Sequence, residues 1–564
     1  MLKSVQLTLT VFLICLSFSS NSKFADESSA LPRLKIGSLE SEQKVIHNRL
    51  GRGLSHYQVT IVTDTSEYAL LSEFLTPENA QRLLSKIKHD TTSDDLENLL
   101  NAESLLSTAQ VMILETEGIE DQVLNNQKTN RVYIKGISSK VDTESFQQRL
   151  VQAGVEMSVI DVSSRQYTPG NFNISVLKLN LAEFQGEIFS VLAQDKIKGL
   201  ETVSKIAVAH NASAATNGGY FAYKEEQGTP GDLAGISVIS GTIVSESVIG
   251  RPALLIQNSP SVQVKILENV VSEIKLSIDD NSFHVDGINR KLGYQFNCGH
   301  MDGGVLVRAS HDVVCRNDNE IVIYDEHFGD VSPDMFTDSL TFLLTEQGTV
   351  SFEPMPQSKF TVPNGQYLIA TSGQKKELLA KHIKSATKAR ITKHLFNDKN
   401  PVAMGQDVFL INGGPTLLVG GIRQESNWAN QGWDPFGSKV GSESADIRDG
   451  KNPSTDVERN DRIAFFDAWV NQRHPRTAVG IDESGNFYAV VVYGRNPQIS
   501  IGASISEMAD IMSSLGATDA INLDGGGSSV MVLNNKLTGL PSDEKGERKV
   551  ADSLIFKVSK EGRE

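Results

Sequence analysis

The chain has 564 residues and carries 53 Lys and Arg against 69 Asp and Glu, which gives a net charge of −16 with His neutral. A protein that binds duplex DNA or RNA needs a basic surface, so this balance argues against a nucleic-acid partner. Apolar residues make up 39% of the chain and charged residues 22%, which is typical of globular proteins and excludes a disordered chain. At roughly 150 residues per domain, the length predicts about three to four folded units.

Residues 1–22 have the pattern of an export signal peptide. Lys3 precedes an apolar run at 5–16, and serines follow where a signal peptidase cuts. This run is shorter than the ~20 residues that cross a bilayer, and no other stretch approaches that length. A buried N-terminal helix is the alternative. We therefore expect a secreted or periplasmic protein with no membrane span.

Two cysteines, Cys298 and Cys315, remain after this segment. An even pair in an oxidising compartment predicts a disulfide, and two free thiols are the alternative. His300 and His311 lie in the same loop, so a metal site stays open, although the spacing matches no familiar zinc pattern.

Residues 23–55 are polar and weakly patterned, which indicates a tether, with a first extended element as the alternative. Residues 56–168 then show two similar units. The first has an alternating strand at 56–62 and a helical stretch capped by Thr76, and the second has a strand, a helix and a strand within 130–162. They predict two small split βαβ-type units and resemble SPOR-like repeats, a family in which several members bind cell-wall glycan. A structural spacer is the alternative.

Residues 174–558 are rich in apolar strands and glycine turns, and we expect helices at 203–210, 375–394 and 504–515. This pattern predicts an α+β fold, in which a large mixed-sheet domain follows the two small units.

Four strand ends in this domain carry Asn beside Gly. Glycine lets backbone N–H groups approach a ligand as an anion-binding concavity, and Asn offers both a donor and an acceptor. A turn needs glycine but does not need a repeated Asn, so together the four motifs predict a binding site. The candidate residues are Asn217, Gly218, Gly219, Asn289, Arg290, Asn412, Gly413, Gly414, Asn522, Gly525, Gly526, Gly527 and Ser528.

These motifs, in this order, resemble the phosphodiester glycosidase family. The resemblance extends over about 174–558 and leaves 1–170 outside. It implies hydrolysis of a sugar 1-phosphodiester at the anomeric bond, with free sugar and a phosphomonoester as products. The further segments that carry the resemblance are 474–481, 492–495, 502–509, 515–529 and 547–548.

Two stretches look like additions to the family core, at 294–318 and 423–472. The second is polar and glycine-rich and carries Trp428 and Trp433. These rings are candidates to stack on a sugar, and packing within the insertion itself is the alternative.

A phosphate ester is a weakly basic leaving group, so cations can replace much of the work of a general acid. Arginine suits this role because its planar fork matches phosphate oxygens. The candidates for this clamp are Arg476, Arg548 and Arg290. Surface or structural ion pairs are the alternative for each of them.

A carboxylate is still needed to activate water or to stabilise the oxocarbenium-like transition state. Asp524 is the first candidate, with a turn contact or a metal ligand as its alternatives, and a structural Ca²⁺ near it stays open. Glu507 is the second, although the helix dipole alone favours Glu in a first helical turn. We expect Asn217, Asn289 and Asn412 to contact sugar hydroxyls or the phosphate.

Together these features predict an exported hydrolase for a sugar-1-phosphodiester of an envelope or capsular glycan, with the N-terminal units as a second contact to cell-wall glycan. A non-catalytic glycan-binding protein and a metal-dependent phosphodiesterase are the alternatives.

Overall fold

The computed structural model describes residues 31–37, 41–62, 68–71, 81–83, 85, 110–115, 130–137, 144, 147–148, 150–151, 157–161, 170–248, 250–296, 301–302, 305–306, 311, 314–336, 338–351, 359–383, 388–433 and 468–563. Strands predominate in these segments and helices are few. None of the helices in the described segments combines the length and the apolar composition that a membrane span requires.

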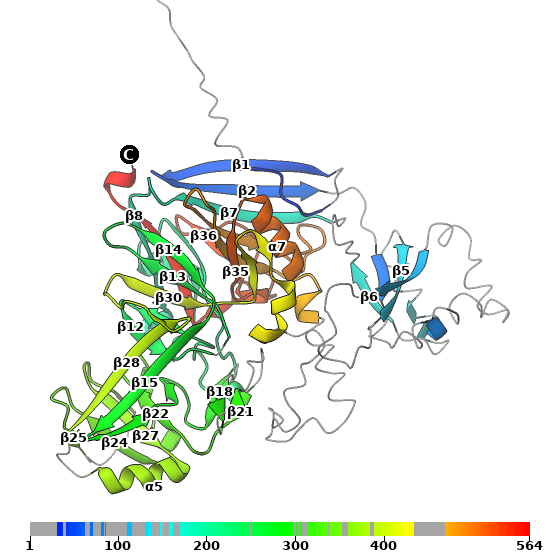
Figure 1. The fold of residues 1–564 in the computed structure, drawn as a ribbon. Helices are drawn as coiled ribbons and strands as arrows, with labels where there is room; N and C mark the ends of the chain where they lie inside the picture. Colours follow the sequence, from blue (N-terminus) through cyan, green and yellow to red (C-terminus); the bar gives the residue numbers. More distant parts are fainter. Residues whose placement is uncertain are drawn as a thin grey trace, which may run out of the picture.

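The main body is organised around an eight-stranded antiparallel sheet (Figure 1). Helix α7 (Ile505–Ser514) packs against strands of this sheet, and its buried Ile505, Met508 and Met512 form part of a core cluster. In sheet order the strands are β1 (Glu42–Gly51), β2 (Leu54–Val62), β7 (Phe172–Asn180), β34 (Asn486–Val492), β33 (Arg476–Ile481), β35 (Asp519–Asn522), β31 (Thr416–Val419) and β32 (Ile422–Arg423).

Strands β1 and β2 correct the predicted domain boundary. The sequence assigned 23–55 to a tether and 56–62 to a first small unit, but β2 pairs with β7 of the main sheet, with Leu54 opposite Leu179. Leu54, Val59 and Ile61 are fully buried. Alternation identifies a half-buried strand but does not say which sheet the strand joins.

The segment between β2 and β7 forms one small sheet rather than two units. Its strand order is β4-β5-β3-β6, and all neighbours are antiparallel. Helical residues at 81–83 follow the first strand, and others at 147–148 follow the third. The first half of this segment supplies β3 and β4, the second half supplies β5 and β6, and the strands of the two halves alternate in one sheet. Figure 1 shows this sheet beside the main body. Its strands are β3 (Tyr68–Leu71), β4 (Gln110–Glu115), β5 (Asn130–Ile137) and β6 (Ser158–Asp161).

Two five-stranded sheets complete the main body, and the core cluster that contains Val479 and Ile521 of the main sheet also contains side chains from both of them. The first consists of β8 (Gly186–Leu192), β10 (Ala214–Asn217), β36 (Met531–Leu533), β37 (Lys536–Leu537) and β39 (Asp552–Val558). The second consists of β11 (Ser237–Ile239), β12 (Thr242–Ser245), β13 (Ala253–Gln257), β14 (Gln263–Leu267) and β30 (Val408–Asn412).

A separate arm with its own apolar core extends from this body (Figure 1). Helix α5 (Gly373–His382) ends earlier than the expected 375–394 helix, because Ala389–Asn397 forms strand β28 beside β15 (Val270–Ile278). The pair β17 (Gly287–Ile288) and β22 (Ile321–Tyr324) is parallel, so the arm contains a mixed sheet. Its other strands are β16 (Asn281–His284), β24 (Leu340–Leu344), β25 (Val350–Ser351), β27 (Tyr367–Thr371) and β29 (Asn400–Pro401).

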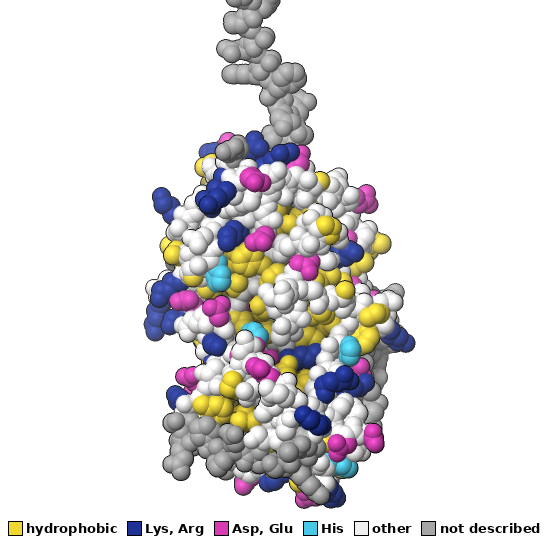
Figure 2. Space-filling view, turned by 90° about the vertical axis from the view of Figure 1, so that its left-hand side faces the viewer, with side chains coloured by type: hydrophobic (Ala, Val, Ile, Leu, Met, Phe, Trp, Pro, Cys, Tyr) yellow, Lys and Arg dark blue, Asp and Glu magenta, His cyan; other side chains and the backbone are white. Residues whose placement is uncertain are grey.

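Figure 2 shows that acidic and basic side chains are interspersed on one face of the molecule. The net charge of −16 is therefore not concentrated on that face, and no continuous basic surface for a nucleic acid is visible there.

Candidate functional site

Asn217 joins three segments that are distant in the sequence. It is the last residue of β10 and is fully buried. Its Nδ2 donates to the backbone oxygen of Asp524 at 2.8 Å, and its Oδ1 accepts from Oγ1 of Thr477 at 2.7 Å. Because β33 and β35 are neighbours, with Ala478 opposite Asn522, Arg476 and the loop after β35 reach the same place. The structure thus brings together two of the four Asn–Gly motifs and the 474–481 segment.

A second carboxylate, that of Asp552 at the start of β39, lies in the same site as Asp524. Asp552 was not among the residues predicted from the sequence. Asp524 is half-buried, and its Oδ1 accepts from the N–H of Gly525 at 2.8 Å. Asp552 is fully buried and accepts from the N–H of Gly219 at 3.0 Å. Burial raises the pKa of Asp524 to about 6, and burial and the charge of Asp524 raise the pKa of Asp552 to about 7. The sequence signal for Asp552 is a polar residue at the first position of an apolar strand, and this signal was missed.

The triple-glycine loop makes room for arginine side chains. A β-carbon on Gly525 would lie 3.2 Å from the carbonyl oxygen of Pro475 and 3.7 Å from Cδ of Arg476. Gly526 faces the guanidinium of Arg495, and Gly527 faces that of Arg548. A β-carbon on the second glycine would lie 3.1 Å from Nη2 of its arginine, and one on the third would collide with its arginine.

This packing corrects the expected role of the glycine N–H groups. The N–H of Gly525 donates to Asp524, and that of Gly526 donates to the carbonyl of Pro475 at 2.8 Å. These two groups are therefore not directed at a ligand. Arg495 was also missed as a site residue, although it ends one of the segments that carry the family resemblance.

The three arginines differ in how their charge is balanced. Arg476 is 1% exposed and donates to the carbonyls of Ala503 at 3.0 Å, Gln472 at 3.2 Å and Trp469. Carbonyls do not neutralise its charge, and burial lowers its pKa to about 10. Arg548 instead pairs with Asp543 at 2.8 Å, and Arg495 lies 3.8 Å from the same carboxylate.

Asn412 and Asn522 both contact Tyr220. Oδ1 of Asn412 accepts from the N–H of Tyr220 at 2.9 Å, and Nδ2 of Asn522 donates to the Tyr220 hydroxyl at 2.8 Å. Close packing also explains several glycines, and a side chain on Gly218 would collide with Asp552. Ser528 is buried. Gly219 packs against Asn412, Gly413 against the backbone of Asn522, and Gly414 against Trp433.

Glu507 forms structural contacts in helix α7, which is the alternative that the sequence left open. Its Oε2 accepts from the N–H of Ser504 at 2.9 Å and completes a capping box. The same carboxylate pairs with Arg473, with Nη2 and Oε1 2.5 Å apart.

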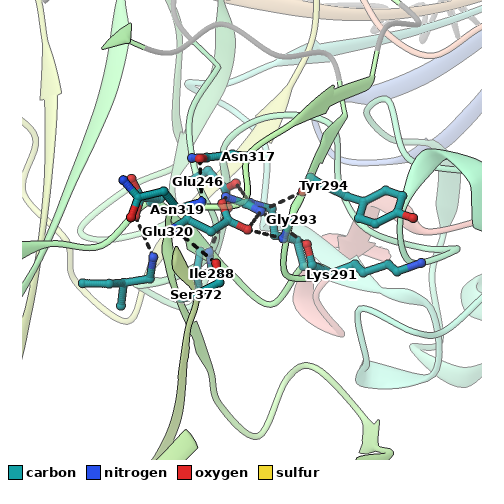
Figure 3. A network of polar contacts seen from close by, with 12 residues as sticks. Glu246, Ile288, Lys291, Gly293, Tyr294, Asn317, Asn319, Glu320 and Ser372 are labelled. Carbon is teal, nitrogen blue, oxygen red and sulfur yellow. Dashed lines mark hydrogen bonds and ion pairs between the residues drawn. The ribbon is translucent and has the colours of Figure 1, made fainter. Parts of the chain in front are cut away.

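Asn289 and Arg290 belong to a different network, at the base of the arm. Arg290 is 2% exposed and pairs with Glu246 at 2.6 Å and Glu320 at 2.7 Å, and both glutamates appear in Figure 3. Asn289 donates to Asp325 at 2.9 Å. The fourth motif is therefore engaged in buried structural contacts, and its expected contact with a ligand stays a prediction.

Trp428 and Trp433, the two candidate rings of the 423–472 insertion, are buried. Trp428 donates from Nε1 to the carbonyl of Thr416 at 2.7 Å, and Trp433 is fully buried. Both rings pack inside the protein and do not form an exposed platform for a sugar. Cys298, one half of the predicted disulfide, and His300 lie outside the described residues.

A calcium ion near Asp524 would need six to eight oxygen ligands, and the positive charge that acts on Asp524 is that of Arg548. One compact group of metal-ligating residue types occurs in the described segments, at Asp325, Glu326 and His327. There Asp325 is already paired with Lys393 at 3.2 Å and bonded to Asn289.

Comparison with known proteins places this site in a family. Residues 342–557 match the family model described as phosphodiester glycosidase. This part of the chain is a phosphodiester glycosidase domain. The domain contains Arg476, Arg495, Asp524, Arg548 and Asp552, whereas Asn217 and Tyr220 precede it.

A 93-residue stretch is 37% identical to N-acetylglucosamine-1-phosphodiester alpha-N-acetylglucosaminidase of Bos taurus and covers 16% of this chain and 17% of that protein. The Homo sapiens protein of the same name is 34% identical over 93 residues, which are 18% of its length. The chain thus spans less than a fifth of the curated relatives that it matches. A candidate exported protein of Burkholderia pseudomallei K96243 shares the fold, with a TM-score of 0.71 and 23% identity over 93% of this chain and 99% of that one.

Proposed function

We propose that the chain is an exported hydrolase that cleaves the anomeric bond of a sugar 1-phosphodiester. The phosphodiester glycosidase domain supports this reaction. The observation that carries the proposal is the arrangement of Arg476, Arg495 and Arg548 against the loop that follows Asp524. Three guanidinium groups beside a carboxylate suit a reaction in which a phosphate leaves and a sugar carbon becomes electron-poor.

The arginines would stabilise the charge that develops on the departing phosphate. As the bond from C1 to the phosphate oxygen breaks, its electron pair moves onto that oxygen, and preorganised cations stabilise it. Arg476 suits this role because carbonyl oxygens hold its orientation without neutralising its charge.

Asp524 would act on the attacking water. With a pKa of about 6, its carboxylate is largely ionised at neutral pH and can accept a proton as the water oxygen bonds to C1. The products are the free sugar and the phosphomonoester. Asp552 accepts from the N–H of Gly219, and burial and the charge of Asp524 raise its own pKa to about 7.

The reaction is tested with the full chain and a sugar-1-phosphodiester substrate, with both products identified. We expect free sugar and phosphomonoester, whereas a sugar 1-phosphate product would show cleavage at phosphorus and contradict the proposal. Asp524→Asn and Arg476→Ala should each lower kcat/KM by about 10³-fold. Asp280→Asn, in the exposed turn after β15, is the matched control and should retain wild-type activity.

The substrate that we propose is part of an envelope or capsular glycan, and the small sheet at 68–161 would add a contact to cell-wall glycan. The apolar segment at 5–16, which indicates export, supports this location. A panel of sugar-1-phosphodiesters that differ in sugar and in aglycone would identify the preferred class.

A further inference from the structure

The two insertions meet at Tyr220, where they form a cationic and aromatic cluster with Arg251. The guanidinium carbon of Arg251 lies 4.1 Å from the centre of the Trp433 ring. His311 stacks on the same ring with centroids 5.3 Å apart and an interplanar angle of 26°. The Tyr220 ring centroid lies 4.8 Å from that of His311. Arg251 and His311 both precede residues 342–557, so the family match does not include them.

This cluster contains buried hydrogen-bond donors that have no acceptor. Arg251 is 3% exposed, and its Nε, Nη1 and Nη2 have no hydrogen-bond partner in the described part of the chain. Nε1 of Trp433 is also a buried donor without a partner there, and so is Nδ1 of His311 in the tautomer that carries its proton on this nitrogen. Buried polar groups are nearly always satisfied in folded proteins. Several unsatisfied groups in one cluster therefore indicate a place for an acceptor from outside the chain.

The acceptor should carry negative charge. Burial lowers the pKa of Arg251 to about 9, and no carboxylate of the described residues pairs with this guanidinium. Burial also lowers the pKa of His311 well below its usual value, and the charges of Arg251 and Arg476 lower it further. A water molecule would satisfy two of these donors at most, whereas an oxyanion offers several lone pairs and the missing charge.

We propose that Arg251 is the base of an oxyanion-binding subsite that accepts a phosphate or a carboxylate group. Tyr220 connects this subsite to the carboxylates of the candidate site: its hydroxyl donates to the carbonyl of Gly414 at 2.6 Å and accepts from Asn522. The charges of Asp524, Arg251 and Arg476 all act on this one side chain. The assignment of the anion to the substrate rests on the proposed function, whereas anion binding itself does not.

Tryptophan fluorescence offers a direct test. The chain has three tryptophans, Trp428, Trp433 and Trp469, and all belong to or pack on one core cluster. We would titrate the full chain with sodium phosphate, and separately with sodium acetate, at constant ionic strength. A saturable change in emission is expected with at least one anion. Saturation by phosphate alone assigns the subsite to a phosphate, and saturation by acetate alone assigns it to the carboxylate of an acidic sugar.

Arg251→Met removes the charge at similar side-chain length and should weaken this binding at least tenfold. Arg251→Lys keeps the charge but loses the planar fork, so it should weaken binding at least threefold even if the methionine variant does not fold. Arg316→Met is the matched control, because the Arg316 guanidinium lies 3.4 Å from the centre of the Tyr294 ring but is exposed. It should bind as the wild type does.

The proposal is overturned if folded wild-type protein shows no saturable response to either anion, or if Arg251→Met binds with unchanged affinity. A response that came from the arginines of the triple-glycine loop would survive in Arg251→Met and would count against the subsite. Hydrolysis is measured separately. Turnover without an anion response would contradict the subsite and support the proposed reaction. An anion response without turnover would support the subsite and contradict the proposed reaction.

Discussion

Asp524 and Asp552 show how burial determines the protonation of single side chains. Both carboxylates have pKa values above the usual 3.8, mainly because burial penalises the charged form. The folded protein therefore binds more protons than the unfolded chain between pH ~4 and ~7, and its stability must fall as the pH rises through this window.

This linkage predicts how Asp552→Asn behaves. An Asn oxygen can still accept from the N–H of Gly219, but the residue no longer titrates. The loss of unfolding free energy between pH 5 and pH 8 should therefore be smaller in the variant than in the wild type, by on the order of 2–4 kcal/mol. Urea unfolding at a series of pH values measures the difference. Equal slopes in the two proteins would show that Asp552 keeps an ordinary pKa.

At the scale of single residues, the sequence identified site residues that stand at strand ends or beside glycines. Asn217, Asp524 and Arg476 were found because they stand beside glycine turns or within recognisable motifs. Asp552 and Arg251 were not, because each is one polar residue beside an apolar strand. Only the fold shows that the first borders the Gly218–Gly219 turn and that the second stacks on a ring more than a hundred residues away.

At the scale of elements, the predicted helices show what local signals can and cannot define. Helix α7 lies where Ser504 and Glu507 form a capping box, and α4 (Val203–Ala209) begins after its cap Thr202. The expected helix at 375–394 was too long. Its second half pairs with β15, and this long-range pairing overrides local helix preference.

Glu507 allows a prediction that separates structure from catalysis. Gln can still complete the capping box, but Glu507→Gln would leave the buried guanidinium of Arg473 without a counter-charge. Stability should fall by about 3 kcal/mol, whereas kcat of the folded enzyme should stay within about tenfold of the wild type. Chemical denaturation and assays below the melting temperature measure the two effects.

Ser504→Ala is the companion variant, because it removes the side-chain cap and leaves the ion pair. It should cost about 1 kcal/mol. A loss of about 10³-fold in kcat for Glu507→Gln, at a temperature where the variant is folded, would instead assign Glu507 to the chemistry.

At the scale of the whole molecule, the small sheet is inserted into the main sheet. The chain leaves the main sheet at the end of β2 and returns at the start of β7. These two strands are neighbours, with Ile61 opposite Phe172. Composition predicted several units but could not show that one of them interrupts another, because an insertion leaves no local signal at the strands it separates. The β1–β2 hairpin is therefore part of the main body.

Replacement of residues 63–171 by a short glycine-containing turn tests this organisation. The turn would join β2 to β7 as a hairpin, so the shortened protein should fold and should hydrolyse a small sugar-1-phosphodiester with kcat/KM within about threefold of the wild type. It should lose cell-wall binding in a sedimentation assay with insoluble glycan, if the small sheet makes that contact. Removal of residues 31–62 is the contrasting change, because it exposes the edge of β7 and deletes the fully buried Leu54, Val59 and Ile61. An unfolded or aggregated product is expected from that deletion, and a stable, active protein without β1 and β2 would show that the hairpin is dispensable.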